Sequence, residues 1–127
     1  MVVEHVFTGI PVADRDAALD WYERLLGRPP ELIPNDHEAA WQLTPTSWIY
    51  IVADPDRAGS GLNTLLVDVL DRFIAGLAER GIAPGPIELI AGGSVRQTII
   101  VDGDGNRLKV GQVHKDAPSA ESATPAD

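Results

Sequence analysis

IPVADRDAALDWYERLLG, residues 10–27, is the pattern of a strand end followed by a capped helix and a stop signal. Asp14 can cap this helix because its side chain can accept hydrogen bonds from the first free backbone amides. The apolar residues recur at positions i, i+3, i+4 and i+7, which places them on one helix face: Ala18, Trp21, Tyr22 and Leu25. Gly27 can adopt the left-handed conformation that ends a helix, and two prolines follow it.

The same pattern occurs again at residues 65–81, LLVDVLDRFIAGLAERG. Its apolar stripe consists of Leu70, Phe73, Ile74 and Leu77. Val12 and Val67 stand at equivalent places before the two helices, 55 positions apart (67 − 12). The chain therefore contains an internal repeat of one strand–helix unit.

The remaining segments extend this repeat. We expect strands at residues 3–12, 31–33, 39–43 and 47–52 in the first half, and at 62–67, 87–90, 95–101 and 106–110 in the second, where the helix covers 70–80. Each half is then a βαβββ module. The predicted fold class is α+β, with modules at about 1–56 and 61–113 forming a curved mixed sheet around a cup and the helices outside. Residues 114–127 lose apolar periodicity, so we expect a disordered tail.

Composition limits the functional classes. The chain has 127 residues, a formal charge of −9 and no cysteine, which excludes disulfides, thiolate zinc sites and a cysteine nucleophile. An acidic surface repels phosphate backbones, so we expect no nucleic-acid partner. There is no apolar run of 18 residues and no secretory signal, so we expect no membrane contact and a cytoplasmic location. The acidity either provides solubility or attracts a cationic small molecule.

No catalytic constellation can be placed in the sequence. A Ser-His-Asp set, a phosphate-binding loop and a functional pair of carboxylates are all missing. Asp102 and Asp104 are close together, but they belong to a predicted hairpin turn, where aspartate is expected for its turn chemistry. We therefore assign no catalytic residue.

Three stretches together resemble the vicinal oxygen chelate superfamily, which includes glyoxalases, bleomycin-resistance proteins and extradiol dioxygenases. Two are the strand–helix stretches at 10–27 and 67–82, and the third is VDGDGNRLKV at 101–110. The third is similar to the family's DPDGN strand entry, with Gly103 where proline is usual. The resemblance covers residues 3–113 and implies two modules around a shared cup.

The resemblance also implies a divalent metal held by His and Glu on the first and last strand of each module, where it can act as a Lewis acid. In this chain those positions fall at Phe7, Leu62, Tyr50 or Trp48, and Lys109. None of these is a usual ligand, and a lysine ammonium has no acceptor to offer a cation. We predict no metal and no cofactor. The alternative is a shifted site that uses His5, one strand repeat (roughly 6.5 Å) from Phe7.

Projecting strand alternation onto this fold gives a set of candidate ligand-binding residues: His5, Phe7, Trp41, Trp48, Tyr50, Leu62, Gln97, Ile99 and Lys109. Tryptophans supply flat walls for an aromatic ligand, and the polar members could orient it. The alternatives are that Trp41 or Trp48 is ordinary packing, as we expect for Trp21, and that His5 is a packing residue. Lys109 either faces solvent or a carboxylate, or points into the cup as a base or an anion-binding group.

The leading hypothesis is a metal-free small-molecule-binding protein similar to the bleomycin-resistance branch, binding a hydrophobic or aromatic compound with a possible role in antibiotic resistance. The resemblance to that branch implies a homodimer whose pairing completes the clefts. A second hypothesis is a lyase, isomerase or dioxygenase of the superfamily with a relocated or absent metal. A third is a structural or regulatory module whose cup is filled by its own side chains.

Overall fold

The computed structural model describes residues 1–114 and contains two copies of one module. The first consists of β1 (Val6–Val12), α1 (Arg15–Leu26), β2 (Leu32–Asn35), β3 (Glu38–Thr44) and β4 (Ser47–Ala53). The second consists of β5 (Leu62–Leu66), α2 (Leu70–Glu79), β6 (Glu88–Ile90), a short 3-10 turn (Ala91–Gly93), β7 (Val95–Val101) and β8 (Arg107–Val113). The predicted α+β class and the two βαβββ modules are confirmed. The predicted tail lies outside the described residues, except for His114.

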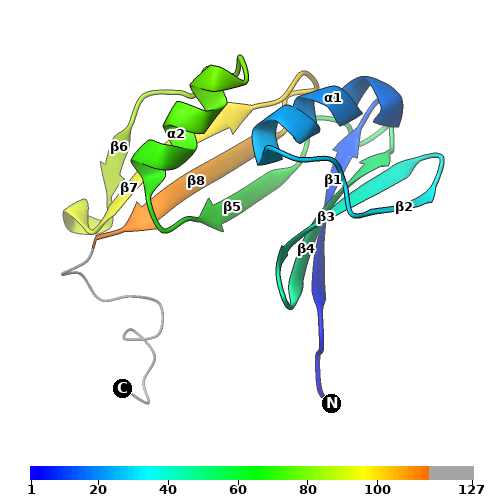
Figure 1. The fold of residues 1–127 in the computed structure, drawn as a ribbon, viewed down its shortest axis with the longest axis horizontal. Helices are drawn as coiled ribbons and strands as arrows, with labels where there is room; N and C mark the ends of the chain where they lie inside the picture. The colour runs from blue at the N-terminus through cyan, green and yellow to red at the C-terminus, as the bar shows by residue number, and fades with distance from the viewer. Residues whose placement is uncertain (115–127) are drawn as a thin grey trace.

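Each module has its own open, mixed four-stranded sheet. The strand orders are β1-β4-β3-β2 and β5-β8-β7-β6, with a parallel first pair in each and antiparallel pairs beyond it. The two sheets are separate, and the helices lie side by side over the same face of the molecule (Figure 1). No helix in residues 1–114 covers the opposite faces (Figure 1), and none there is long and apolar enough to span a membrane.

Two strand boundaries differ from the sequence prediction for reasons of pairing. The first strand begins at Val6, because Val6 pairs with Ser47 at the start of β4. The Val6 amide also donates a hydrogen bond to the Thr46 carbonyl at 2.8 Å. The chain before it projects past the hairpin without a strand partner (Figure 1). At the other end, β8 continues to Val113, since β7 offers it partners as far as Val95.

The helix caps differ between the modules. At α1, the Asp14 carboxylate accepts from the amides of Asp16 and Ala17 at 2.9 and 3.3 Å, as predicted, and Gly27 follows with φ 79°. At α2, Val69 occupies the cap position and has no side-chain acceptor. Gln112 of β8 supplies one instead, since its Oε1 accepts from the Leu70 amide at 2.8 Å. The second helix is therefore capped across the module by its own sheet.

The hydrophobic core lies between the helices and the sheets. Alternate strand residues point toward the helices and are buried there, among them Ile10, Val12, Ile49, Ile51, Ile100, Leu108 and Val110. The helices contribute Tyr22, Leu25, Leu70 and Leu77. Because strand side chains alternate, the residues between these buried positions must point to the uncovered faces. We call these uncovered sides the first and second open faces, after their sheets.

A buried polar network joins the two modules. The Tyr22 hydroxyl donates to Asp102 Oδ2 at 2.6 Å, and burial together with this bond raises the pKa of Tyr22, which keeps its proton in place. Asp102 also accepts from the amides of Asp104 and Asn106, both at 2.9 Å. The Asn106 side chain donates to Asp102 and to the carbonyl of Pro11, and accepts from the amide of Gly61.

The helix ends form a second junction between the modules. Arg24 donates to the carbonyl of Arg80 at 3.3 Å, and Arg80 donates in return to the carbonyls of Arg24 and Leu25. Each arginine thus satisfies carbonyls that the end of the other helix leaves free. The exchange holds the C-terminal ends of the two helices together.

Replacing Asp102 is expected to loosen the module junction. The Asp102→Ala change leaves the Tyr22 hydroxyl and two amides without their acceptor, which should lower the free energy of unfolding by about 2–4 kcal/mol. Tyr22→Phe removes one donor to a carboxylate and should cost about 2 kcal/mol. Urea unfolding measures both. Asp56→Ala, in the exposed connector, is the control, and an equal loss in Asp56→Ala and Asp102→Ala would contradict the role of the network.

Candidate functional site

The first open face carries an aromatic pair. Phe7 of β1 and Trp48 of β4 are neighbours in the parallel register, and their rings stack with centroids 5.2 Å apart and an interplanar angle of 13°. Phe7 remains 51% exposed. Stacked rings that stay accessible offer a flat apolar surface on which a further ring can lie.

Tyr50 extends this aromatic surface along β4. It pairs with Gly9 of β1, and a Cβ at position 9 would stand 2.6 Å from the Tyr50 hydroxyl oxygen. The Tyr50 ring therefore lies directly across the backbone of Gly9, in space that any other side chain at position 9 would occupy. A hollow of about 290 Å³ lies beside it, lined by Phe7, Leu32, Pro34, Glu38, Ala40 and Tyr50. Both aromatic residues of this hollow, Phe7 and Tyr50, were predicted from the sequence. The residues that β2 and β3 contribute to its rim were not predicted.

Glu38 is the acidic group of this hollow. Its Oε1 accepts a hydrogen bond from the Asn35 side chain at 2.7 Å, across the β2–β3 turn. The carboxylate is thus held at the rim by a turn interaction. The floor of the hollow is apolar.

The second open face carries the other predicted residues. The register puts Leu62 opposite Arg107 and Lys109 opposite both Thr64 and Ile99, so these side chains share one face. Gln97 belongs to the same face and is buried between β6 and β8. Lys109 is half-buried, and its side chain makes no hydrogen bond or ion pair with any described residue. The sequence analysis missed Arg107 and Thr64, although alternation from Lys109 would have located Arg107.

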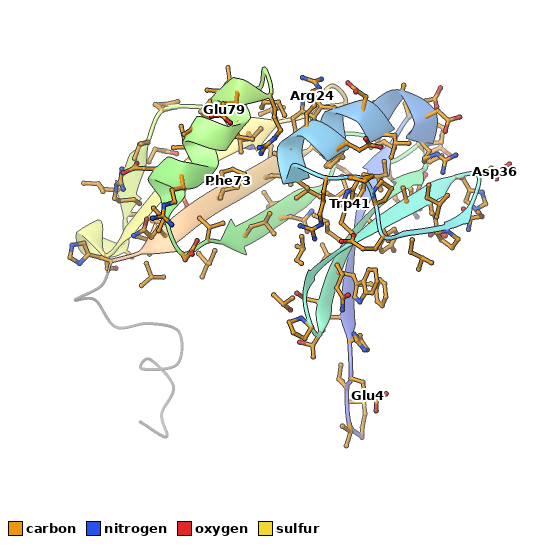
Figure 2. All side chains as sticks on the ribbon, viewed as in Figure 1. Glu4, Arg24, Asp36, Trp41, Phe73 and Glu79 are labelled. Carbon is orange, nitrogen blue, oxygen red and sulfur yellow. The ribbon has the colours of Figure 1, made fainter. Side chains whose placement is uncertain are left out.

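Trp41 does not belong to an open face, which corrects the sequence expectation. It pairs with Ile49, whose side chain points toward the helices, so Trp41 must point there too. The ring is 0% exposed and its Nε1 donates to the carbonyl of Arg28 at 2.9 Å. Figure 2 shows Trp41 beneath α1. Trp21 packs edge-on against Tyr22 with centroids 4.8 Å apart, on the helix side as expected.

His5 lies apart from the other candidates. It is exposed and precedes the paired part of β1, in the segment that projects beyond the sheet next to Glu4 (Figure 2). Its ring makes no hydrogen bond with a described residue. A packing role is therefore not seen, and the structure does not bring His5 to the hollow beside Tyr50.

The residues at the family's metal positions do not fit a metal. Phe7 and Leu62 have no donor atoms for a cation, and Lys109 is itself cationic. Within residues 1–114, no three His, Cys, Asp or Glu side chains are grouped so that they could hold a metal ion. No step of a reaction can be derived through a metal at these positions.

A second hollow lies where the modules meet. Its volume is about 460 Å³, and it is lined by Thr8, Leu25, Leu26, Leu43, Thr44, Ser47, Trp48, Ile49, Asn63, Thr64, Leu65, Leu66, Val67, Phe73 and Arg80. Trp48 therefore borders this hollow and also stacks on Phe7, which lines the hollow beside Tyr50. No sequence signal identified this lining, because it depends on how the two modules are joined.

Comparison with solved structures supports the assignment of the fold. A glyoxalase/bleomycin resistance protein from Catenulispora acidiphila is 40% identical, with a TM-score of 0.80 and a match covering 86% of this chain and 97% of that one. An antibiotic-binding protein from a Streptomyces species is 24% identical (TM-score 0.69; 89% and 98% covered). A bleomycin-binding protein in complex with bleomycin is 22% identical (TM-score 0.69; 88% and 98% covered).

No protein-family model and no curated protein matches the sequence. The two more distant structures share the fold with this chain. The 40% identity to the first extends over nearly the whole of both proteins. The three sequence stretches, the two βαβββ modules and this identity agree, and the chain belongs to the glyoxalase/bleomycin resistance family of the vicinal oxygen chelate superfamily.

Proposed function

We propose that this protein binds a flat hydrophobic or aromatic small molecule without a metal. The stacked Phe7–Trp48 pair beside the Tyr50 hollow is the observation that carries the proposal. These rings occupy or adjoin positions where the superfamily places metal ligands, so the part of the cup that usually performs chemistry is here an apolar surface. The antibiotic-binding and bleomycin-binding neighbours support the binding of a small molecule. Sequestration of such a compound in the cytoplasm, as in drug resistance, is the role we infer.

The open faces support a homodimer as the binding form. Large apolar side chains on them remain more than half exposed: Phe7 51%, Leu62 65%, Leu66 58% and Val101 54%. Contiguous apolar surface of this kind on a small protein usually marks an interface or a ligand site. A second copy that places its open faces against these would enclose a cup between a first face and a second face. Gln97, Ile99 and Lys109 would then join Phe7, Trp48 and Tyr50 around one ligand.

Ligand binding is expected to quench tryptophan fluorescence through Trp48. A panel of naphthalene and acridine derivatives of different charge should contain compounds that quench the emission. Trp48→Leu should weaken their binding about tenfold, because aromatic stacking contributes roughly 0.5–1.5 kcal/mol beyond area burial. Calorimetry measures the affinity, and Trp21→Phe on the helix side serves as the control. A panel without any ligand would favour a cup filled by its own side chains.

The purified protein is expected to bind no stoichiometric divalent metal at the cup. Incubation with manganese, nickel, zinc or iron(II), followed by gel filtration and elemental analysis, tests this directly. The physical reason is that apolar and cationic side chains occupy the ligand positions. Stoichiometric metal that is lost in His5→Ala would instead show a relocated site and favour an enzyme of the superfamily.

Sedimentation at micromolar concentration is expected to give twice the chain mass of 13.6 kDa. Leu66→Glu puts a charge into the proposed interface and should shift the protein toward the monomer, because an unpaired charge is costly to bury. Ala75→Glu, on an exposed position of α2, should leave the dimer intact. A wild-type mass near 13.6 kDa would contradict the dimer.

A further inference from the structure

The repeat matches aromatic residues of the first module with cationic residues of the second. In the first module, β1 and β4 pair Phe7 with Trp48 and Gly9 with Tyr50. With the repeat offset of 55, the positions equivalent to Phe7 and Gly9 are Leu62 and Thr64 of β5. In the register with β8, Leu62 pairs with Arg107 and Thr64 pairs with Lys109. The places held by Trp48 and Tyr50 on the first open face are therefore held by Arg107 and Lys109 on the second.

The side chains of these two cations have no polar partner among the described residues, a state that they share with Arg72 on the exposed surface of α2. Five other arginines of the described chain form ion pairs with carboxylates: Arg15, Arg24, Arg28, Arg57 and Arg96. Arg80 instead donates to backbone carbonyls. The side chains of Arg107 and Lys109 make no hydrogen bond or ion pair within residues 1–114, although the chain as a whole has an excess of carboxylates.

The acidic side chains on the open faces do not neutralise them. On the second sheet, Glu88 lies in β6, where it pairs with Gln97 of β7. Strand β6 is two strands away from β8, so roughly 10 Å separate the backbone of Glu88 from β8. On the first sheet, Glu38 of β3 accepts a hydrogen bond from the Asn35 side chain, at the end of the edge strand β2. The second open face thus has a local positive charge within a protein of net charge −9.

A cation on a face that a ligand or a second copy covers is stable only if a negative group lies beside it. Lys109 is already half-buried, between Thr64 and Ile99 of the neighbouring strands. Covering it with a ligand or a second copy would remove more of its water, and a desolvated cation without a partner is costly. The negative charges elsewhere act over a Debye length of about 8 Å at physiological salt, so a direct contact dominates over them.

We propose that the ligand of this cup is a planar aromatic anion, with its ring on the Phe7–Trp48–Tyr50 surface and its carboxylate or phenolate against Lys109 and Arg107. This inference rests on the proposed function, since it assumes that a first face and a second face enclose one ligand. It opposes one of the two interpretations of the acidic composition, that the protein attracts a cationic small molecule, and is compatible with the other, that the acidity provides solubility.

Three probes with one ring system separate charge from shape. Calorimetry with 2-naphthoate, 2-naphthamide and 2-naphthylmethylammonium keeps the aromatic body constant and changes only the substituent. We expect 2-naphthoate to bind about tenfold more tightly than the amide, because hydrogen bonds to charged groups are the stronger class, and the ammonium to bind most weakly. The preference for the anion should also decrease as salt is raised.

Variants assign the preference to one side chain. Lys109→Gln should reduce the affinity for 2-naphthoate about tenfold and leave that for 2-naphthamide unchanged, and Lys109→Glu should make the ammonium the better ligand. Arg72→Gln removes another cation without a partner, on exposed α2, and should change neither affinity. Thermal unfolding of each variant confirms that it folds.

The outcomes separate a failure of the anion preference from a failure of the aromatic binding site. If the amide or the ammonium binds as tightly as 2-naphthoate, the anion preference is wrong while the aromatic site stands. If Lys109→Gln and Arg72→Gln weaken 2-naphthoate equally, Lys109 does not hold the anion. If none of the three probes binds, and the wider aromatic panel also gives no ligand, the proposed function fails and this inference fails with it.

Discussion

The structure depends on one buried carboxylate. Asp102 holds its own turn through the amides of Asp104 and Asn106, and it accepts the hydroxyl of Tyr22 from the helix of the other module. Asn106 then carries the connection to the carbonyl of Pro11 and the amide of Gly61. Because no buried side-chain donor or acceptor in this network is left without a partner, the network fixes the two modules together with apolar packing and the hydrogen bonds that Arg24 and Arg80 exchange.

This junction has a consequence for function. It fixes both helices on the same side of the molecule, so no helix of residues 1–114 covers the two open faces (Figure 1). Aromatic side chains on one face and cations on the other are therefore accessible, although each sits in a regular strand. A rigid strand framework suits a binding site, because register alone determines the spacing of its side chains.

The residues at the metal positions illustrate how one fold can serve different chemistry. The backbone positions remain, and the register still brings them together in pairs on β1 with β4 and on β5 with β8. At the positions that the family resemblance assigns to metal ligands, this chain carries aromatic rings, a leucine and a lysine. Apolar and cationic side chains of this kind favour binding by shape and electrostatics, which does not require an open coordination position.

The sequence by itself determined the module, its repeat and the faces of most strands. The spacing from Asp14 located Phe7, and the offset of the repeat located Leu62, because both are consequences of strand and helix periodicity. Trp41 was misplaced, since its side depends on the register with Ile49 and not on its own segment. The cap from Gln112, the hollow between the modules and the partnerless state of Lys109 were decided only by tertiary structure. Each of them involves residues that are distant in the chain, and no local pattern specifies which distant groups come into contact.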